Sequence, residues 1–264
     1  MPADLAALAA HLDQETAALR AVLEVAGTAR WSTATPSPGW TVADQVRHLA
    51  YFDEAATASV AGLDAFAPYR EEAVRLGTAL PDDALARSRD RDGDALLAWF
   101  DGARATMVAA MLAAGPSRRI PWYGPDYSVA SAITGRIMET WAHGQDVDDA
   151  LGVAHEATDA LYDVARLCAR TRANSYAAHG RRAPDGEVAV ELSAPDGSTW
   201  RFGDADAAEQ VSGDAVEFCL LATQRRHRAD TGLVATGPAA EEWLGLAQAF
   251  AGPPGEGRAP VGER

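Results

Sequence analysis

The sequence contains no lysine, so all 23 of its basic residues other than histidine are arginine. Catalysis through a lysine Schiff base, including that of pyridoxal phosphate, is therefore excluded. Only two cysteines occur, Cys168 and Cys219, without a recognisable spacing, which favours a reducing cytoplasm over a disulfide framework. A Gly-x-Ser-x-Gly motif is also missing, and a serine hydrolase of that type is unsupported.

Long apolar runs and an excess of positive charge are absent as well. No apolar run approaches the roughly 18 residues that span a bilayer, and residues 1–4 lead into an acidic amphipathic segment without a basic region or cleavage site. We therefore expect a cytoplasmic protein with no membrane partner. The formal net charge of −15 argues against nucleic acid, because phosphate binding depends on Lys and Arg contacts. A small-molecule substrate remains, and the chain is expected to be a monomer or homodimer.

The first half of the sequence has the pattern of four amphipathic helices. Apolar residues recur at helical spacing from Leu5 to Leu23, after a capping Asp4. A second helix begins at Thr41, which forms an approximate capping box with Asp44. A third covers about 96–112 and a fourth runs from Ser128 to Gly152. Residues 62–94, where Pro68, Gly77 and Pro81 interrupt any long helix, are expected to form a crossover.

The second half changes to a mixed pattern. Segment 158–176 is helical in character, strands are expected at 188–192 and 199–202 around a turn at 195–197, and helices at about 214–223 and 238–250. We predict a mainly α protein: a four-helix bundle with a long crossover over 1–152, a small α+β domain with its linking helix over 153–250, and a flexible tail over 251–264.

Three residues form the candidate site. Glu139 and His143 stand at i and i+4, one turn apart on the same face of the fourth helix. With His48 from the second helix they would provide three metal ligands and leave a fourth position open, as catalytic zinc sites do. Each part has a plainer interpretation: Glu139 and His143 as a surface ion pair, and His48 as a core histidine with a hydrogen-bond partner.

Other residues are candidates for supporting roles. Asp146, one turn beyond His143, would orient a ligand imidazole or accept a proton; the alternative is a solvated acid in the run that includes Asp148 and Asp149. Four aromatic residues would line a substrate cavity at the mouth of the bundle, or else belong to the core. They are Trp122 and Tyr123, in an aromatic loop over 121–125, and the second-helix pair Tyr51 and Phe52.

Two segments carry a family resemblance. Residues 39–49, Gly-Trp-Thr-Val-Ala-Asp-Gln-Val-Arg-His-Leu, and residues 138–147, Met-Glu-Thr-Trp-Ala-His-Gly-Gln-Asp-Val, resemble the DinB-like metalloprotein superfamily and, within it, its actinobacterial mycothiol-dependent maleylpyruvate isomerase branch. The resemblance implies a divalent metal, with zinc first and nickel, iron or manganese as alternatives, on His48, Glu139 and His143. Residues 191–255 resemble the small C-terminal domain of a subgroup, similar to the sterol-carrier type of fold.

The resemblance also implies an activity. The metal would bind a low-molecular-weight thiol such as mycothiol, and the sulfur would attack an electrophilic small molecule, for isomerisation or for transfer. Arg136 is a candidate for holding the thiol. Two alternatives stay open: a thiol-independent metal-dependent hydrolase, lyase or cyclase of specialised metabolism, and a metal-containing small-molecule binding protein.

Overall fold

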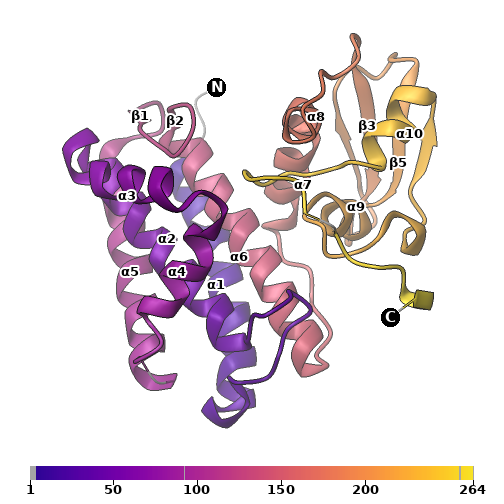
Figure 1. The fold of residues 1–264 in the computed structure, drawn as a ribbon. Coiled ribbons are helices and arrows are strands. Elements are labelled where there is room, and N and C mark those ends of the chain that lie inside the picture. Colours follow the sequence, from indigo (N-terminus) through magenta and orange to yellow (C-terminus); the bar gives the residue numbers. More distant parts are fainter. Residues whose placement is uncertain (1–3, 92, 256, 264) are drawn as a thin grey trace. The chain divides into compact units, whose positions relative to one another are not determined.

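The computed structural model describes residues 4–91, 93–255 and 257–263, and the chain divides into two compact units between Ala160 and Leu161. Four long helices build the first unit: α1 (Leu5–Ala26), α2 (Val42–Ala61), α5 (Gly93–Ala114) and α6 (Val129–Leu151). They lie side by side in Figure 1, where α2 packs against α5 and α6, and α1 packs against α6. The predicted four-helix bundle is confirmed.

The apolar faces of these helices meet in one core. Its buried members include Leu19, Val46, Leu49, Phe100 and Val147, which recur at the helical spacing seen in the sequence. Helix α5 is long and apolar enough to cross a membrane by length and composition alone. However, Phe100 and Met107 are fully buried in the unit, and Arg104 of the same helix forms a buried ion pair. These are the contacts of a core helix.

The predicted helix starts are also confirmed. Asp4 accepts hydrogen bonds from the amides of residues 6 and 7, and Ser128 accepts one from the amide of residue 131. Thr41 and Asp44 form a reciprocal capping box at the start of α2. Because these caps satisfy the first free N–H groups, each helix begins where its local sequence dictates.

The crossover between α2 and α5 contains α3 (Leu63–Leu76), the 3-10 turn η2 (Gly77–Ala79) and α4 (Leu80–Arg87). The expectation that Pro68 interrupts a helix is wrong, since α3 runs through it. Phe66, two residues earlier, is fully buried and its ring stacks on Tyr69 and Trp122. This packing offsets the hydrogen bond that proline cannot make. Gly77 then ends α3 with a φ of 55°.

The second unit combines helices with a four-stranded sheet. Its helices are α7 (Leu161–Arg170), α8 (Arg172–Ala178), α9 (Ala215–Ala222) and α10 (Pro238–Leu244). The strands are β3 (Val188–Ser193), β4 (Thr199–Phe202), β5 (Glu209–Asp214) and β6 (Val234–Thr236), in the order β4-β3-β5-β6. Strand β3 pairs with β5 in parallel, and the other pairings are antiparallel.

Helix α9 packs on β3 and β5, where Val190, Leu192 and Val211 are buried. The α+β character and the two predicted strands are confirmed. Two helix predictions need correction. The predicted helix at 158–176 is two helices, because Thr171 Oγ1 donates to the carbonyl of Cys168 and the helix ends there. The predicted helix at 238–250 stops at Leu244, and the Gln248 amide bonds Ser175 Oγ instead.

Short elements complete the described chain. They are the hairpin β1 (Arg119–Ile120) and β2 (Tyr127–Ser128), and the 3-10 turns η1 (Thr28–Arg30), η3 (Arg228–Asp230) and η4 (Val261–Glu263). The β1–β2 hairpin carries the aromatic loop at its turn and leads directly into α6. It therefore places that loop at the end of the bundle where α6 begins.

Candidate metal centre

Helices α2 and α6 bring the three predicted ligands together. His48 Nε2 lies 3.4 Å from Glu139 Oε2, and His143 Nε2 lies 3.3 Å from the same oxygen. The three ligand atoms all lie within 4.8 Å of one another, and the two imidazole rings are 4.4 Å apart. Glu139 and His143 lie together because they are one turn apart on α6. His48 lies beside them because α2 packs on α6.

These separations suit a tetrahedral ion. Metal–ligand bonds of about 2.0–2.2 Å in tetrahedral geometry place neighbouring ligand atoms about 3.3–3.5 Å apart. Both nitrogen–oxygen distances fall in that range without any movement of the side chains. Two imidazoles and one carboxylate also form a donor set that zinc, nickel, iron and manganese accept. The residues present therefore fit a divalent metal.

Ionisation in the cluster also favours a cation. Burial, together with the nearby His143, lowers the pKa of His48 to about 4, so this imidazole is neutral at pH 7. Burial would raise the pKa of Glu139, but hydrogen bonds from His143 and His48 hold it well below its usual range. The centre therefore combines an uncharged imidazole with a carboxylate. The Glu139 side chain keeps 25% of its surface exposed, which leaves the centre open on that side.

Gln45 fixes the orientation of one ligand. It lies one turn before His48 on α2, fully buried, and its Oε1 is 2.5 Å from His143 Nδ1. An amide oxygen only accepts, so Nδ1 carries a proton and Nε2 is the nitrogen that faces Glu139. Gln45 Nε2 in turn donates to Thr35 Oγ1 at 2.9 Å. This is the outer hydrogen bond that metal-ligating histidines commonly have.

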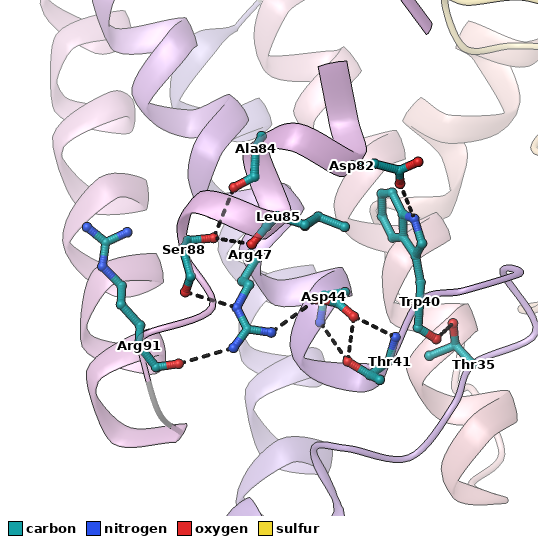
Figure 2. A network of polar contacts seen from close by, with 10 residues as sticks. All are labelled: Thr35, Trp40, Thr41, Asp44, Arg47, Asp82, Ala84, Leu85, Ser88 and Arg91. Carbon is teal, nitrogen blue, oxygen red and sulfur yellow. Dashed lines mark hydrogen bonds and ion pairs between the residues drawn. The ribbon is translucent and has the colours of Figure 1, made fainter. Parts of the chain in front are cut away.

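Trp40 covers both histidines. Its ring stacks on His143 at 6.0 Å with an interplanar angle of 12° and lies 5.2 Å from the ring of His48. As Figure 2 shows, the indole Nε1 donates to Asp82 on α4 at 3.0 Å. The crossover thus holds the indole over the centre, where it restricts the access of water.

A second set of bonds in Figure 2 anchors the start of α2. The guanidinium of Arg47 donates to Asp44 at 3.1 Å and to the carbonyls of Ser88 and Arg91 at 3.2 and 3.1 Å. Because Arg47 precedes His48, these bonds tie the helix turn that carries the ligand to the end of the crossover. The ligand therefore stands on a rigid segment.

Asp146 is not a solvated acid. It is fully buried, and its Oδ2 accepts a hydrogen bond from Ser37 Oγ at 2.9 Å. Neighbouring Asp148 is also buried and pairs with His155, so the solvated-run interpretation is wrong for both. Asp146 secures the loop that carries Trp40. Its role as a proton acceptor stays a prediction.

The four predicted aromatic residues form one continuous cluster. The ring of Phe52 lies 4.6 Å from that of His48, 5.1 Å from Tyr51 and 5.9 Å from Tyr123. Trp122 is next, 4.9 Å from Tyr123. Burial raises the pKa of Tyr123, with Tyr51 adding to the shift, so its hydroxyl keeps its proton. Phe52 thus touches the centre directly, and the others extend the aromatic surface away from it.

Arg136 is part of the bundle interior. Its Nε pairs with Asp53 at 2.9 Å and its Nη2 donates to the Leu49 carbonyl at 3.2 Å. The guanidinium still acts on the centre, because its charge contributes to the low pKa of His48. Contact with a thiol stays a prediction for this residue.

Three neighbours of the centre were missed from the sequence: Gln45, Trp40 and Tyr127. One feature of the sequence could have predicted Gln45: it is a polar residue one turn from His48, beside the apolar stripe of α2. Trp40 lies in a loop, where helical spacing gives no guidance. Burial raises the pKa of Tyr127; the charge of Arg136 opposes the shift and that of Glu139 adds to it. The charge of Glu139 therefore acts on Tyr127.

Comparison with known proteins places these features in context. The family model described as "Mycothiol maleylpyruvate isomerase N-terminal domain" matches residues 12–148. Two uncharacterized proteins from two strains of Mycobacterium tuberculosis are each 40% identical over 255 residues, covering 97% of this chain and 94% of the relative.

Solved structures share the fold. The mycothiol-dependent maleylpyruvate isomerase aligns with a TM-score of 0.60 at 17% identity, and a histidine-to-alanine variant of it with 0.61 at 16%. Each alignment covers 88% of this chain and 93% of the other. The family match includes His48, Glu139 and His143, and the curated relatives match along almost the whole length. The chain therefore belongs to the mycothiol maleylpyruvate isomerase N-terminal domain family.

Proposed function

We propose that this protein is a metal-dependent enzyme that uses a low-molecular-weight thiol of the mycothiol type to isomerise an electrophilic small molecule, or to transfer the thiol to it. The observation that carries the proposal is the convergence of His48 Nε2, His143 Nε2 and Glu139 Oε2 at metal-ligand separations. Three protein ligands leave one position for an exogenous group, and family membership supports a thiol as that group.

A divalent metal held by His48, Glu139 and His143, with zinc first, would supply the positive charge that lowers the pKa of a thiol. The protein's own residues prepare the site for this. Gln45 keeps the proton of His143 on Nδ1, and Trp40 and Phe52 place aromatic surface against the histidines. A sulfur anion beside these rings is poorly hydrated and therefore more nucleophilic.

Transfer of the thiol, unlike isomerisation, needs a proton on the electrophile. Addition of the sulfur to an unsaturated carbon makes one carbon–sulfur bond and places negative charge on the electrophile. Loss of the same sulfur after rotation gives an isomer, whereas protonation of the adduct completes transfer. Tyr123, whose hydroxyl keeps its proton because burial raises its pKa, would donate a hydrogen bond to the charge on the electrophile, and Asp146 is the candidate proton acceptor.

The first test uses the metal itself. Cobalt-substituted protein is titrated with mycothiol, and the visible absorption is expected to change as sulfur enters the coordination sphere and to saturate at one thiol per metal. Unchanged absorption at saturating thiol refutes the thiol part of the proposal. Turnover of an electrophilic substrate without thiol would favour the hydrolase, lyase or cyclase alternative.

The second test concerns the ligands. His143→Ala is expected to lose bound metal, measured by elemental analysis after gel filtration. His179→Ala, an exposed histidine in the second unit, is the matched control and keeps the metal. Full metal content in His143→Ala refutes the site. Loss of metal with retained binding of a small molecule would support the binding-protein alternative.

A further inference from the structure

A pocket of ≈ 160 Å³ lies in the second unit, where α8, α9 and α10 end. We call it the Arg228 pocket. Its walls come from separate segments of the chain: His179, residues 221–228, residues 244–247, Gly255 and residues 257–258. Pockets for drug-sized molecules measure about 300–1,000 Å³, so this one suits a smaller ligand. All of its walls belong to the second unit, and the inference is therefore independent of the metal centre.

The pocket is lined by positive charge in an acidic protein. Its charged walls are the arginines 226, 228 and 258, and among the described residues no Asp or Glu lines it. Guanidinium groups stay protonated in proteins, whereas the whole chain has a formal net charge of −15. Glu256 lies outside the described residues, and its single charge would still leave the three arginines in excess. The lining therefore favours an anion.

Two effects oppose an anion, and each is smaller than the charge of the arginines. The C-terminal end of a helix carries about half a negative charge, so the three helices that end here contribute at most about 1.5 charges. Glu241 Oε2 lies 3.5 Å from Arg228 Nη2, and the Glu241 side chain is 62% exposed. Water screens an ion pair of this length and exposure. The guanidinium charge of Arg228 is therefore only weakly compensated.

Arg228 and His227 bring hydrogen-bond donors to the pocket. Arg228 Nη1 donates to Thr231 Oγ1 at 3.3 Å, and its Nε has no hydrogen-bond partner in the described part of the chain. His227 Nδ1 accepts a hydrogen bond from the amide of Ala229 at 3.1 Å, so the proton of the neutral ring is on Nε2, which donates. The protein itself thus leaves Arg228 incompletely hydrogen-bonded, as a ligand-binding arginine requires.

The turn that follows α9 shapes this wall. Gln224 has a φ of 61°, and of the described residues other than glycine it is the one with a positive φ. Helices usually end on glycine in this conformation, and a strained residue in its place is typical of binding sites. The Gln224 side chain lines the pocket, and a Cβ on Gly255 would lie 3.1 Å from its Oε1. The end of the chain is therefore fitted closely against this turn.

The number of donors favours a phosphate group over a carboxylate. A carboxylate pairs bidentately with one guanidinium, whereas three guanidinium groups line the pocket. A phosphate monoester has a charge of about −1.5 to −2 and three acceptor oxygens, which match several arginines at once. Beside the arginines, Leu221 and Leu244 are buried and line the pocket with Leu246. We propose that the Arg228 pocket binds a small phosphomonoester, with its phosphate on the arginines and a short apolar group against the leucines.

Isothermal titration calorimetry of the full-length protein at low ionic strength tests this with three probes: butyl phosphate, inorganic phosphate and pentanoate. Butyl phosphate is expected to bind more tightly than phosphate, because its chain meets the leucines, and more tightly than pentanoate, because it has more charge and more acceptors. Arg228→Gln and Arg258→Gln are each expected to weaken butyl phosphate about 10- to 100-fold. Arg182→Gln removes the same charge from a side chain of this unit that is 86% exposed and is the matched control.

Far-UV circular dichroism checks the fold of each variant. Arg258 lies beyond α10, so Arg258→Gln tests the pocket even where Arg228→Gln does not fold. Absence of binding to the wild type, full affinity in Arg258→Gln, or an equal loss in Arg182→Gln overturns the inference. Binding that disappears in His143→Ala would place the ligand at the metal centre and also overturns it. Pentanoate as tight as butyl phosphate refutes the phosphate group, and inorganic phosphate as tight refutes the apolar substituent.

Discussion

Asp53 lies at the centre of a buried ion-pair network in the bundle. Its carboxylate has no exposed surface and bridges two buried arginines, Arg104 Nε at 2.6 Å and Arg136 Nε at 2.9 Å. Arg104 Nη1 also donates to Thr16 Oγ1 at 2.6 Å. The four residues come from α1, α2, α5 and α6, so one acid joins all four long helices.

Replacement of Asp53 by alanine leaves two guanidinium groups buried without their counter-charge. Breaking a buried ion pair from one side costs about 3–5 kcal/mol. Burial already lowers the pKa of Arg104, and Asp53 opposes this effect. Loss of Asp53 therefore makes the charged form of the buried Arg104 guanidinium less favourable. We expect Asp53→Ala to lower the free energy of unfolding by at least about 3 kcal/mol, a large part of the 5–15 kcal/mol that a typical domain has.

Urea unfolding followed by far-UV circular dichroism measures this loss, since the bundle helices dominate the signal. The matched control is Asp101→Ala, which removes the pair between Asp101 and Arg20 on the solvent-exposed side of α5 and α1. A pair of this exposure is worth about 0–1 kcal/mol. If Asp53→Ala costs no more than Asp101→Ala, the reasoning about the buried network is refuted.

Two further predictions concern histidines. Gln45→Leu removes the acceptor that keeps the proton of His143 on Nδ1. We expect it to weaken metal binding about 10- to 100-fold, as measured by competition with a chelator. Unchanged metal affinity would contradict the orienting role of Gln45. Burial lowers the pKa of His155, but the 2.5 Å bond to Asp148 and the charges of Asp148, Glu15 and Asp149 together outweigh it, and the pKa is raised. Its stabilising effect is complete below the unfolded pKa of about 6.5 and is lost as the pH rises through the folded value. His155→Gln should therefore flatten the fall in urea midpoint above about pH 6.5, whereas Glu15, whose pKa is also raised by burial, acts from about pH 4.5. An identical slope in the variant would exclude this pair as the cause.

The features that could be predicted are local in sequence. The caps Asp4, Thr41 and Ser128 act on amides within three residues, and the Glu139–His143 spacing is one helical turn. His48 was within reach of prediction because a bundle brings helix faces together, and its stripe of Val46 and Leu49 showed which face is buried.

The features that could not be predicted depend on contacts between distant segments. A run of acidic residues in a sequence predicts a solvated helix face. Asp146 is nevertheless buried, and it accepts a hydrogen bond from Ser37, which lies 109 positions away in the sequence. Strand β5 has the sequence Glu-Gln-Val-Ser-Gly-Asp, without the alternation that marks a half-buried strand. It forms because β3 and β6 pair with it on both sides.

The candidate metal centre and the crossover are tied together. The residues that would hold the metal lie on α2 and α6. The crossover supplies Asp82, which bonds the Trp40 indole, and the carbonyls of Ser88 and Arg91, which bond Arg47 (Figure 2). Because the two carbonyls belong to the backbone, substitution of those two side chains leaves the Arg47 bonds in place, whereas substitution of Asp82 removes the bond to Trp40. The geometry of the centre therefore depends on α2, α6 and the crossover together.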